Sequence, residues 1–521
     1  MDKLGVLRQY FGHSSFRHGQ EELIDNILSG RDVLGVLPTG AGKSICYQIP
    51  AILLGGITIV ISPLISLMQD QVLALNQAGV PAAYINSSLS YNQCMEALRR
   101  ASNMAYKIIY VAPERIKTKA FIDFIKKVPI SLVAVDEAHC VSQWGQDFRK
   151  SYLDIADFVS AISPRPTLAA FTATATRHVK EDILKLLSLK DPFVLSTGFD
   201  RPNLYFEVRH DKNKDDTLLS IIQKWQGKSG IVYCSTRKNV NKVCDFLRKN
   251  GISAVRYHAG ISDEKRKQAQ DDFQFDRADV MVATNAFGMG IDKSNVYFVV
   301  HYNMPMDIES YYQEAGRAGR DGEKADCILL YSKQDVIIAK YILSKGNDRA
   351  ELEPLEKTLL EQRDAERLKR MTFYSTTKKC LRNYLLAYFG EYINEDCGNC
   401  SSCIGKSKLP KFSPKTYVVS SGNELVFAAL RMLRNRIALS KKLPAYIIFQ
   451  DSSLRDMADK MPKTIQEFES ISGVGDKRKE QYGEIFIELI KALDIALNEG
   501  KLSSLQEAQN IARDVFNAYK T

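Results

Sequence analysis

The alternation of short apolar runs with longer helical patterns between residues 31 and 331 constrains the fold of this chain most strongly. Strands that alternate with helices form βαβ units and hence parallel sheets. A polar stretch at 211–216 divides the apolar runs into two sets, so the pattern predicts two α/β domains with a linker there. The predicted strands are 33–37, 57–62, 107–111, 132–135, 168–172, 230–234, 280–283, 296–301 and 327–331.

The chain changes character after residue 336. A charged helical pattern leads to a cysteine-rich turn, a segment rich in lysine, serine and proline follows, and apolar residues at helical spacing then return. The whole length of 521 residues exceeds the ~250–300 residues that one core supports. The predicted organisation is two α/β domains at 1–207 and 208–336, a helical metal-binding domain at 337–404, a basic linker at 405–421, a small all-α domain at 422–500 and a tail at 501–521.

Composition narrows the class of protein. Hydrophobic residues at 45% and charged residues at 25% are typical of soluble globular proteins. The longest apolar run, 57–61, is far shorter than the ~18 residues of a membrane span, and the first thirty residues hold no apolar signal core. We therefore expect the chain to stay in the compartment where it is made. The net charge of +10 suits a polyanionic partner without requiring one.

The sequence Pro-Thr-Gly-Ala-Gly-Lys-Ser at 38–44 follows the first predicted strand and opens a helix. In this context backbone N–H groups and a helix N-terminus bind phosphate, while the lysine reaches the β- and γ-phosphates and the serine reaches Mg²⁺. Leu37 stands where the strict Walker pattern has glycine, so this is a variant loop. The residues expected to hold the nucleotide here are Thr39, Gly40, Gly42, Lys43 and Ser44.

A second site is predicted where the apolar strand before residue 136 ends in two acids, Asp136 and Glu137. Asp136 suits the Mg²⁺ shell, and Glu137 suits polarisation of an attacking water. Two adjacent acids after a strand are often only a solvated turn. The phosphate loop favours the catalytic interpretation, because the strand ends of one parallel sheet converge on one site.

A third site is predicted at 313–322, in the sequence Gln-Glu-Ala-Gly-Arg-Ala-Gly-Arg-Asp-Gly of the second α/β domain. Arg317 and Arg320 are three residues apart, which would place them on one face of a helix. An arginine that meets a transferring phosphate is worth roughly 10³–10⁵ in rate. The glycines argue against a purely structural surface helix, because each weakens a helix by ~1 kcal/mol.

Four of the ten cysteines cluster, and their spacing predicts a structural Zn²⁺ site. Four thiolates close the coordination shell, so this zinc would support folding rather than catalysis. The other cysteines are scattered, which favours a reducing, cytosolic compartment over a disulfide scaffold. The expected ligands are Cys380, Cys397, Cys400 and Cys403.

Taken in order, these motifs resemble those of superfamily 2 helicases, and further motifs narrow the resemblance to the RecQ family. The further motifs are Phe-Arg-His-Gly-Gln at 16–20, Ser-Pro-Leu at 62–64, Pro-Glu-Arg at 113–115, Phe-Thr-Ala-Thr-Ala at 171–175 and Ala-Thr-Asn-Ala-Phe-Gly-Met-Gly-Ile-Asp at 283–292. With the cysteine cluster and the final helical domain, the resemblance covers nearly the whole chain. The resemblance implies two RecA-like parallel-sheet domains, a helical zinc-binding subdomain and a small all-α HRDC-like domain. It also implies an ATP-dependent 3′-to-5′ DNA helicase that uses ATP, Mg²⁺ and Zn²⁺ and acts in DNA repair, recombination or replication.

The resemblance assigns roles to residues around the nucleotide. Gln20 would bond the adenine edge while His13 and Arg17 flank its faces, although the family commonly has proline where this chain has His18. Lys43 and Arg320 would stabilise the transferring phosphate, with Arg317 and Gln313 completing the sensing face.

The resemblance also points to DNA contacts and partners. Residues 139–149 are similar to an aromatic-rich loop that couples DNA binding to hydrolysis, and aromatic faces stack on bases with ~1–3 kcal/mol each. The implied partners are single-stranded and partly duplex DNA and single-strand-binding or repair proteins, in the cytoplasm, on the nucleoid if the cell is bacterial. The residues expected at DNA are Arg115, Trp144, Phe148, Arg149 and Thr284, with Arg434, Lys441 and Tyr446 in the HRDC-like domain.

Several alternatives stay open from sequence alone. Trp144 could be a core residue, and the basic side of the last domain could be a solvated surface without a DNA partner. An RNA helicase shares the acid box, and an ATP-gated DNA clamp or annealing factor would use the same motor. RecQ proteins often carry a winged helix between the zinc site and the HRDC domain, but the 18 residues of 404–421 are too few for a domain of at least ~50.

Overall fold

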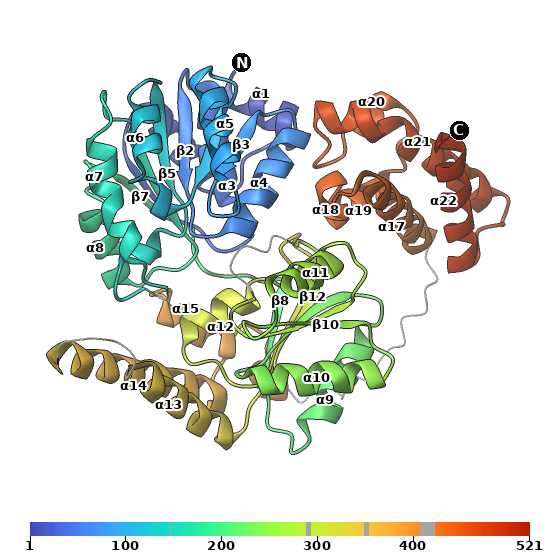
Figure 1. Ribbon diagram of the computed structural model, residues 1–521. Coiled ribbons are helices and arrows are strands. Elements are labelled where there is room, and N and C mark those ends of the chain that lie inside the picture. Colours follow the sequence, from blue (N-terminus) through green and yellow to red (C-terminus); the bar gives the residue numbers. More distant parts are fainter. Residues whose placement is uncertain (146, 288–292, 348–353, 407–421, 521) are drawn as a thin grey trace. The chain divides into compact units, whose positions relative to one another are not determined.

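A computed structural model describes residues 1–521 except 146, 288–292, 348–353, 407–421 and 521 (Figure 1). The described residues form two compact units. The first unit contains 1–198 and the C-terminal helices, and the second contains the described residues of 199–412. No helix in the described part of the chain is long and apolar enough to cross a bilayer.

The first unit is built on a seven-stranded, fully parallel sheet with the order β3-β4-β2-β5-β6-β1-β7. Its central strands are buried on both faces, as their runs of valine, isoleucine and leucine predict. The strands are β1 Val33–Val36, β2 Ile57–Ile61, β3 Ala82–Ile85, β4 Ile108–Val111, β5 Ile130–Val135, β6 Thr167–Thr172 and β7 Phe193–Ser196.

The helices of this sheet domain include short 3₁₀ and π segments where the chain turns. One of the better-defined starts is at Ser90, which forms a reciprocal capping box with Gln93. The elements are α1 Lys3–Val6, η1 Leu7–Phe11, α2 Gln20–Leu28, α3 Lys43–Leu53, α4 Ile65–Gln77, α5 Tyr91–Ser102, η2 Pro113–Arg115, α6 Lys119–Ile125, η3 Ala138–Val141, η4 Lys150–Asp154, α7 Ile155–Ser160 and α8 Arg177–Leu186.

The second unit holds a six-stranded parallel sheet with the order β10-β11-β9-β12-β13-β8. The prediction of two parallel sheets is therefore confirmed. The strands are β8 Leu204–Arg209, β9 Ser229–Tyr233, β10 Ala254–Tyr257, β11 Val280–Ala283, β12 Val296–His301 and β13 Ala325–Leu330. Helices α9 Lys214–Lys224, α10 Arg237–Lys249, α11 Asp263–Gln274 and α12 Ile308–Ala315 connect them.

The boundary between the sheets differs from the predicted linker at 211–216. β8 pairs with β13 along its whole length, so residues 204–209 already belong to the second sheet. The structure divides the units after Gly198, and 211–216 lies between β8 and α9. The polar stretch is thus a surface turn inside the second domain.

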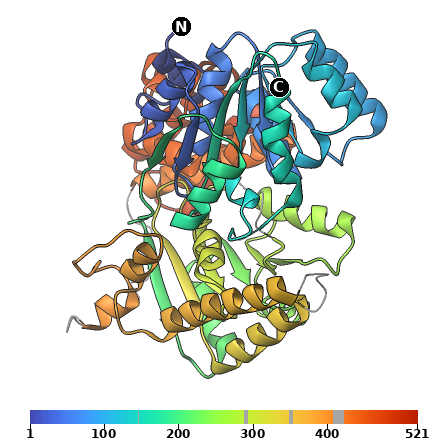
Figure 2. The same cartoon turned by 90° about the vertical axis from the view of Figure 1, so that its left-hand side faces the viewer.

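A helical segment follows the second sheet, as predicted. Its two long helices lie side by side in both views (Figures 1 and 2). The helices are α13 Lys333–Asn347, α14 Pro354–Thr376, α15 Leu381–Tyr388 and α16 Ser401–Lys406. Of the predicted linker at 405–421, the first two residues end α16 and the rest lies outside the described residues.

The C-terminal residues form a small all-α domain with its own core. The predicted tail at 501–521 is wrong in its main part, because Leu505–Lys520 forms a helix whose Ala508, Ala512 and Phe516 are buried in that core. The helices are α17 Gly422–Lys441, α18 Ala445–Ile448, α19 Asp451–Lys460, α20 Ile465–Glu469, α21 Asp476–Asn498 and α22 Leu505–Lys520.

Candidate functional site

The phosphate loop leaves the end of β1 and passes directly into α3. Gly40 and Gly42 have φ of +85° and +80°, in the left-handed region that favours glycine. Lys43 and Ser44 are the first two residues of α3, so the N-terminus of that helix faces the inside of the loop. This is the arrangement that binds phosphate oxygens. Leu37 is fully buried, which explains an apolar residue at the variant position.

Gln20 fixes the adenine motif to this loop. Its Nε2 donates to the carbonyl oxygens of Ala41 and Gly42, each at 3.1 Å, and its Oε1 accepts from the Arg17 backbone N–H at 2.9 Å. Arg17 also bonds the Gly40 carbonyl. A Cβ on Gly42 would lie 2.5 Å from Gln20 Nε2, so only glycine allows this contact. In this structure the Gln20 amide therefore bonds the phosphate loop, whereas the sequence-based expectation was a bond to the base.

The two acids lie at the end of β5, on the same sheet edge as the phosphate loop. Asp136 is buried, and its Oδ1 accepts from the Glu137 backbone N–H at 3.0 Å. The backbone of Glu137 is in the left-handed region, with φ of +47°, which residues other than glycine rarely adopt. Its carboxylate lies 3.9 Å from Lys43 Nζ and 3.3 Å from His139 Nδ1. The predicted meeting of acids and phosphate loop is what the sheet order produces.

β6 lies between β5 and β1 in the sheet, so the end of β6 is next to the acids that follow β5. His139 Nδ1 is 2.9 Å from Thr172 Oγ1, at the last residue of β6. Thr172 Oγ1 in turn donates to the Thr174 carbonyl at 3.0 Å. These contacts link Glu137 through His139 to the Thr-Ala-Thr segment.

The acid site fits a divalent cation. Burial, followed by the neighbouring Glu137, raises the pKa of Asp136 to about 6, and Lys43 acts in the opposite direction. A buried carboxyl with a raised pKa regains its ionised form when a cation binds beside it. The donors offered by Asp136 and Ser44 are oxygens, the ligands that Mg²⁺ prefers.

The two arginines of the second domain lie beyond the helix on which they were predicted. α12 ends at Ala315, and residues 316–322 form turns in which Gly319 and Gly322 have positive φ. The glycines end the helix, so the spacing of three does not place both arginines on one helical face. Arg317 is buried near Tyr233, whereas Arg320 is partly exposed. Gln313, on α12, is partly exposed.

The aromatic loop presents Trp144 to solvent, with 51% of its surface exposed and its ring 6.5 Å from that of His178. The core interpretation of Trp144 is therefore wrong. Phe148 is partly exposed. Arg149 is partly exposed, and it bonds Asp147 Oδ2 at 2.8 Å and the Pro63 carbonyl at 3.0 Å. Its guanidinium thus holds the loop in place.

The remaining predicted DNA contacts fall into two groups. Arg115 ends η2, and Thr284 follows β11, both partly exposed; the rest of that motif, 288–292, lies outside the described residues. In the all-α domain Lys441 is exposed and Tyr446 partly exposed. Arg434 is not a surface residue, because it is 1% exposed and its Nη1 bonds Asp451 Oδ1 at 2.6 Å and the Phe449 carbonyl at 2.9 Å. This buried ion pair is structural, and the prediction for Arg434 is wrong.

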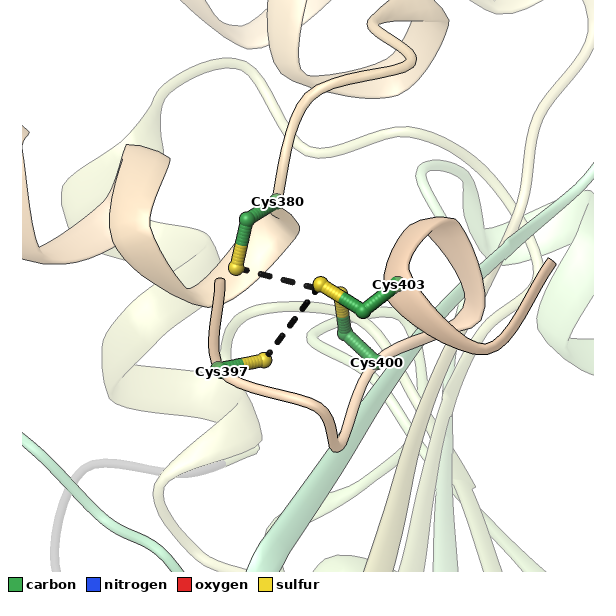
Figure 3. A group of neighbouring side chains, drawn as sticks. All are labelled: Cys380, Cys397, Cys400 and Cys403. Atoms are coloured by element: carbon green, nitrogen blue, oxygen red, sulfur yellow. Dashed lines mark hydrogen bonds between the residues drawn. The ribbon is translucent and has the colours of Figure 1, made fainter. Parts of the chain in front are cut away.

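The four clustered cysteines converge on one point (Figure 3). Their sulfur atoms all lie within 4.8 Å of one another, and the closest pairs are 3.4, 3.9 and 4.0 Å apart. Tetrahedral zinc with Zn–S bonds of ~2.3 Å separates its sulfurs by about 3.8 Å. Backbone N–H groups of Asn383 and Asn399 point at two of the sulfurs, which supports thiolate charge. The cysteines therefore fit a closed zinc centre, as predicted.

Comparisons with known proteins agree with this arrangement. Four family descriptions match in order: DEAD/DEAH box helicase at 17–182, helicase conserved C-terminal domain at 213–322, RecQ zinc-binding at 333–404 and HRDC domain at 423–490. The ATP-dependent DNA helicase RecQ of Bacillus subtilis is 37% identical over 94% of this chain and 98% of its own length. This chain belongs to the RecQ family. The RecQ helicase of Pasteurella multocida is 35% identical over 94% and 93% of the two chains.

Solved structures support the fold. A Mycobacterium smegmatis helicase Lhr structure has a TM-score of 0.53 at 17% identity and covers 88% of this chain and 74% of its own. Mss116p, with a TM-score of 0.53 at 16% identity, covers 72% and 85%.

The alignment of this RecQ-family chain with the Bacillus subtilis protein is longer than the part of the chain that it covers. Because 94% of 521 residues is about 490, roughly 97 of the 587 positions aligned with the Bacillus subtilis protein have no residue from this chain. The zinc-binding match ends at 404 and the HRDC match begins at 423. The gap between those two matches holds 18 residues, too few for a further domain.

Proposed function

We propose that this RecQ-type, ATP-dependent DNA helicase moves 3′ to 5′ along one DNA strand and couples each hydrolysis to a step. The observation that carries the proposal is the meeting of the phosphate loop, Asp136, Glu137 and Thr172 at one edge of the first sheet. The direction comes from the family resemblance. Single-stranded and partly duplex DNA are the proposed substrates.

In the proposed mechanism each residue has one task. Lys43 carries the charge that holds the β- and γ-phosphates, and Glu137 orients the attacking water. Ser44 and Asp136 would hold Mg²⁺, which when bound neutralises charge on the phosphates. Arg320 supplies positive charge to the transferring phosphoryl group, and Arg317 supports it from its buried position beside Tyr233.

One experiment separates this proposal from its alternatives. ATP hydrolysis is measured with single-stranded DNA, with RNA and without nucleic acid, and strand separation is measured on duplexes with a 3′ or a 5′ tail. We expect strong stimulation by DNA and unwinding from the 3′ tail. The RNA arm is needed because a relative 38% identical, from Acanthamoeba polyphaga mimivirus, is described as a putative ATP-dependent RNA helicase. Stimulation without unwinding from either tail would favour a clamp or annealing factor.

Trp144→Ala is expected to uncouple the motor. Its exposed ring is available to stack on a base, so its loss should leave basal hydrolysis intact and reduce stimulation by DNA about tenfold, the effect of ~1.4 kcal/mol of lost stacking. Strand separation should fall with it. Tyr91→Ala is a matched control, because Tyr91 is an exposed aromatic on the same domain. Equal stimulation in Trp144→Ala and wild type would remove Trp144 from the DNA site.

A second expectation concerns duplex length. Each base-pair step costs on the order of 1.4 kcal/mol of stacking to open. A winged-helix wedge is one way to meet this cost, and the 18 residues between the two matches leave no room for it there. We expect good unwinding of short duplexes with a 3′ tail and a steep loss of yield as the duplex lengthens at constant tail length. Undiminished yield on long duplexes would indicate a wedge elsewhere in the chain.

A further inference from the structure

Arg320 lies in turns that follow the end of α12, so helical hydrogen bonds do not fix their backbone. Past Ala315 the backbone carbonyls of 316–319 are not used in a helical ladder, and irregular backbone of this kind needs other partners. Gly319 N–H donates to the Val296 carbonyl at 2.8 Å, which ties the turn to the start of β12. The carbonyl side of the turn is held from a different segment of the chain.

Arg201 binds three of these carbonyls at once. Its guanidinium donates to Gly316 O at 3.3 Å, Ala318 O at 3.0 Å and Gly319 O at 2.6 Å. A planar, always charged fork can bridge several oxygens in fixed geometry, which an ammonium cannot. Burial lowers the pKa of Arg201, and the charge of nearby Arg320 acts in the same direction. The two arginines are therefore close enough to interact.

Asn203, two residues after Arg201, also bonds backbone carbonyls of this turn. Its Nδ2 donates to Gly319 O at 2.9 Å and to Glu323 O at 2.8 Å, so it spans the turn on both sides of Arg320. Gly319 has φ of +54°, and a Cβ there would lie 2.5 Å from Asn203 Nδ2. The close approach of Asn203 is thus possible only because residue 319 is glycine.

The segment that carries Arg201 and Asn203 is itself anchored to the zinc-binding subdomain. Arg382, two residues after the ligand Cys380 and 4% exposed, donates from Nη1 to the Asp200 carboxylate and to the Arg201 carbonyl, each at 2.6 Å. Asn399, between two zinc-ligand cysteines, donates to the Pro202 carbonyl at 3.3 Å. The side chains of Arg382 and Asn399, beside the zinc-site cysteines, therefore fix the position of the Arg201 segment.

We infer that Arg201 and Asn203 are positioning residues for Arg320: they clamp the turn that carries it, from a segment fixed to the zinc-binding subdomain. The inference rests on the proposed role of Arg320 in phosphoryl transfer. It predicts that loss of the clamp acts on the chemical step, because Arg320 would serve the transition state rather than the binding of ATP.

The test compares Arg201→Ala, Arg201→Lys, Arg320→Ala and the double variant Arg201→Ala/Arg320→Ala in the full chain. The readouts are kcat and KM for ATP with saturating single-stranded DNA, together with Tm and zinc content. We expect kcat of Arg201→Ala to fall ten- to a hundredfold with KM changed less than threefold, and Arg201→Lys to recover part of the rate. The double variant should be no slower than Arg320→Ala alone. Arg248→Ala is the control, because Arg248 also bonds a backbone carbonyl in this unit, that of Ala254.

The possible outcomes separate the two claims. A wild-type kcat in Arg201→Ala, even with a lowered Tm, would overturn the inference and leave a purely structural role. A double variant slowed by the full product of the single effects would also overturn it, because Arg201 would then act independently of Arg320. If Arg320→Ala keeps the wild-type kcat, the proposed role of Arg320 fails; a slow Arg201→Ala beside it would refute the clamp as well.

Discussion

Glu137→Gln should bind ATP almost as tightly as the wild type and hydrolyse it about 10²- to 10⁴-fold more slowly. The amide keeps the size of the side chain and the left-handed backbone of residue 137, but it removes the charge that orients and polarises water. The wild-type carboxylate lies 3.9 Å from Lys43 Nζ and 3.3 Å from His139 Nδ1, beside the phosphate loop where the water would attack. The measurements are ATP affinity in a binding assay and kcat in steady state.

Lys43→Ala should behave differently, because it removes the charge at the β- and γ-phosphates and so abolishes hydrolysis together with much of the binding. Glu181→Gln, an exposed glutamate paired with Arg177 on α8, is a control that should retain wild-type kinetics. Wild-type hydrolysis by Glu137→Gln would show that another group positions the water.

Cys400→Ser should have the second large effect, on folding. Structural zinc contributes on the order of 10 kcal/mol of apparent binding free energy, which is also folding free energy. Cys400 is fully buried within the cluster, and the three remaining thiolates cannot close the shell. We expect the zinc content to fall from about one per chain to near zero and the segment at 333–404 to become sensitive to proteolysis.

Cys94→Ser tests whether any cysteine change would do the same. Cys94 is a partly exposed free cysteine on α5, and its replacement should leave both zinc content and Tm unchanged. A wild-type protein that is stable and free of zinc after purification without chelators would refute the metal assignment.

The sequence predicted the central strands of both sheets and missed four others: β3, β7, β8 and β10. All four are edge strands. An edge strand is covered on fewer sides, so it mixes polar and apolar residues, as Phe193–Ser196 does with alternate residues exposed. Apolar runs identify strands buried on both faces, and this explains both the success and the omission. The same omission of β8 displaced the predicted domain boundary.

The candidate site was predictable where a short motif determines its own local structure. The phosphate loop, the acid pair and three of the four zinc-site cysteines each lie within a few residues of sequence. Arg434 and Arg201 show the limit. One looked like part of a basic face and lies in a buried ion pair, and the other drew no attention although it bonds three carbonyls. Both depend on partners that are distant in sequence, Arg201 on residues 115 to 118 positions away.

The pairing of β8 with β13 has a consequence for synthesis on the ribosome. The first sheet is complete once Ser196 has emerged, but β8 must wait for Leu330 before its partner strand exists and for Cys400 before its other contact, at Phe206, can form. At ~5–20 residues per second the wait for Leu330 is about 6–24 s. During that interval the nascent chain carries an unpaired strand end, the kind of edge that invites aggregation. Cys400 is one of the four zinc-site cysteines, so its bridge to Phe206 ties this edge strand to a subdomain that is synthesised only after the sheet it flanks.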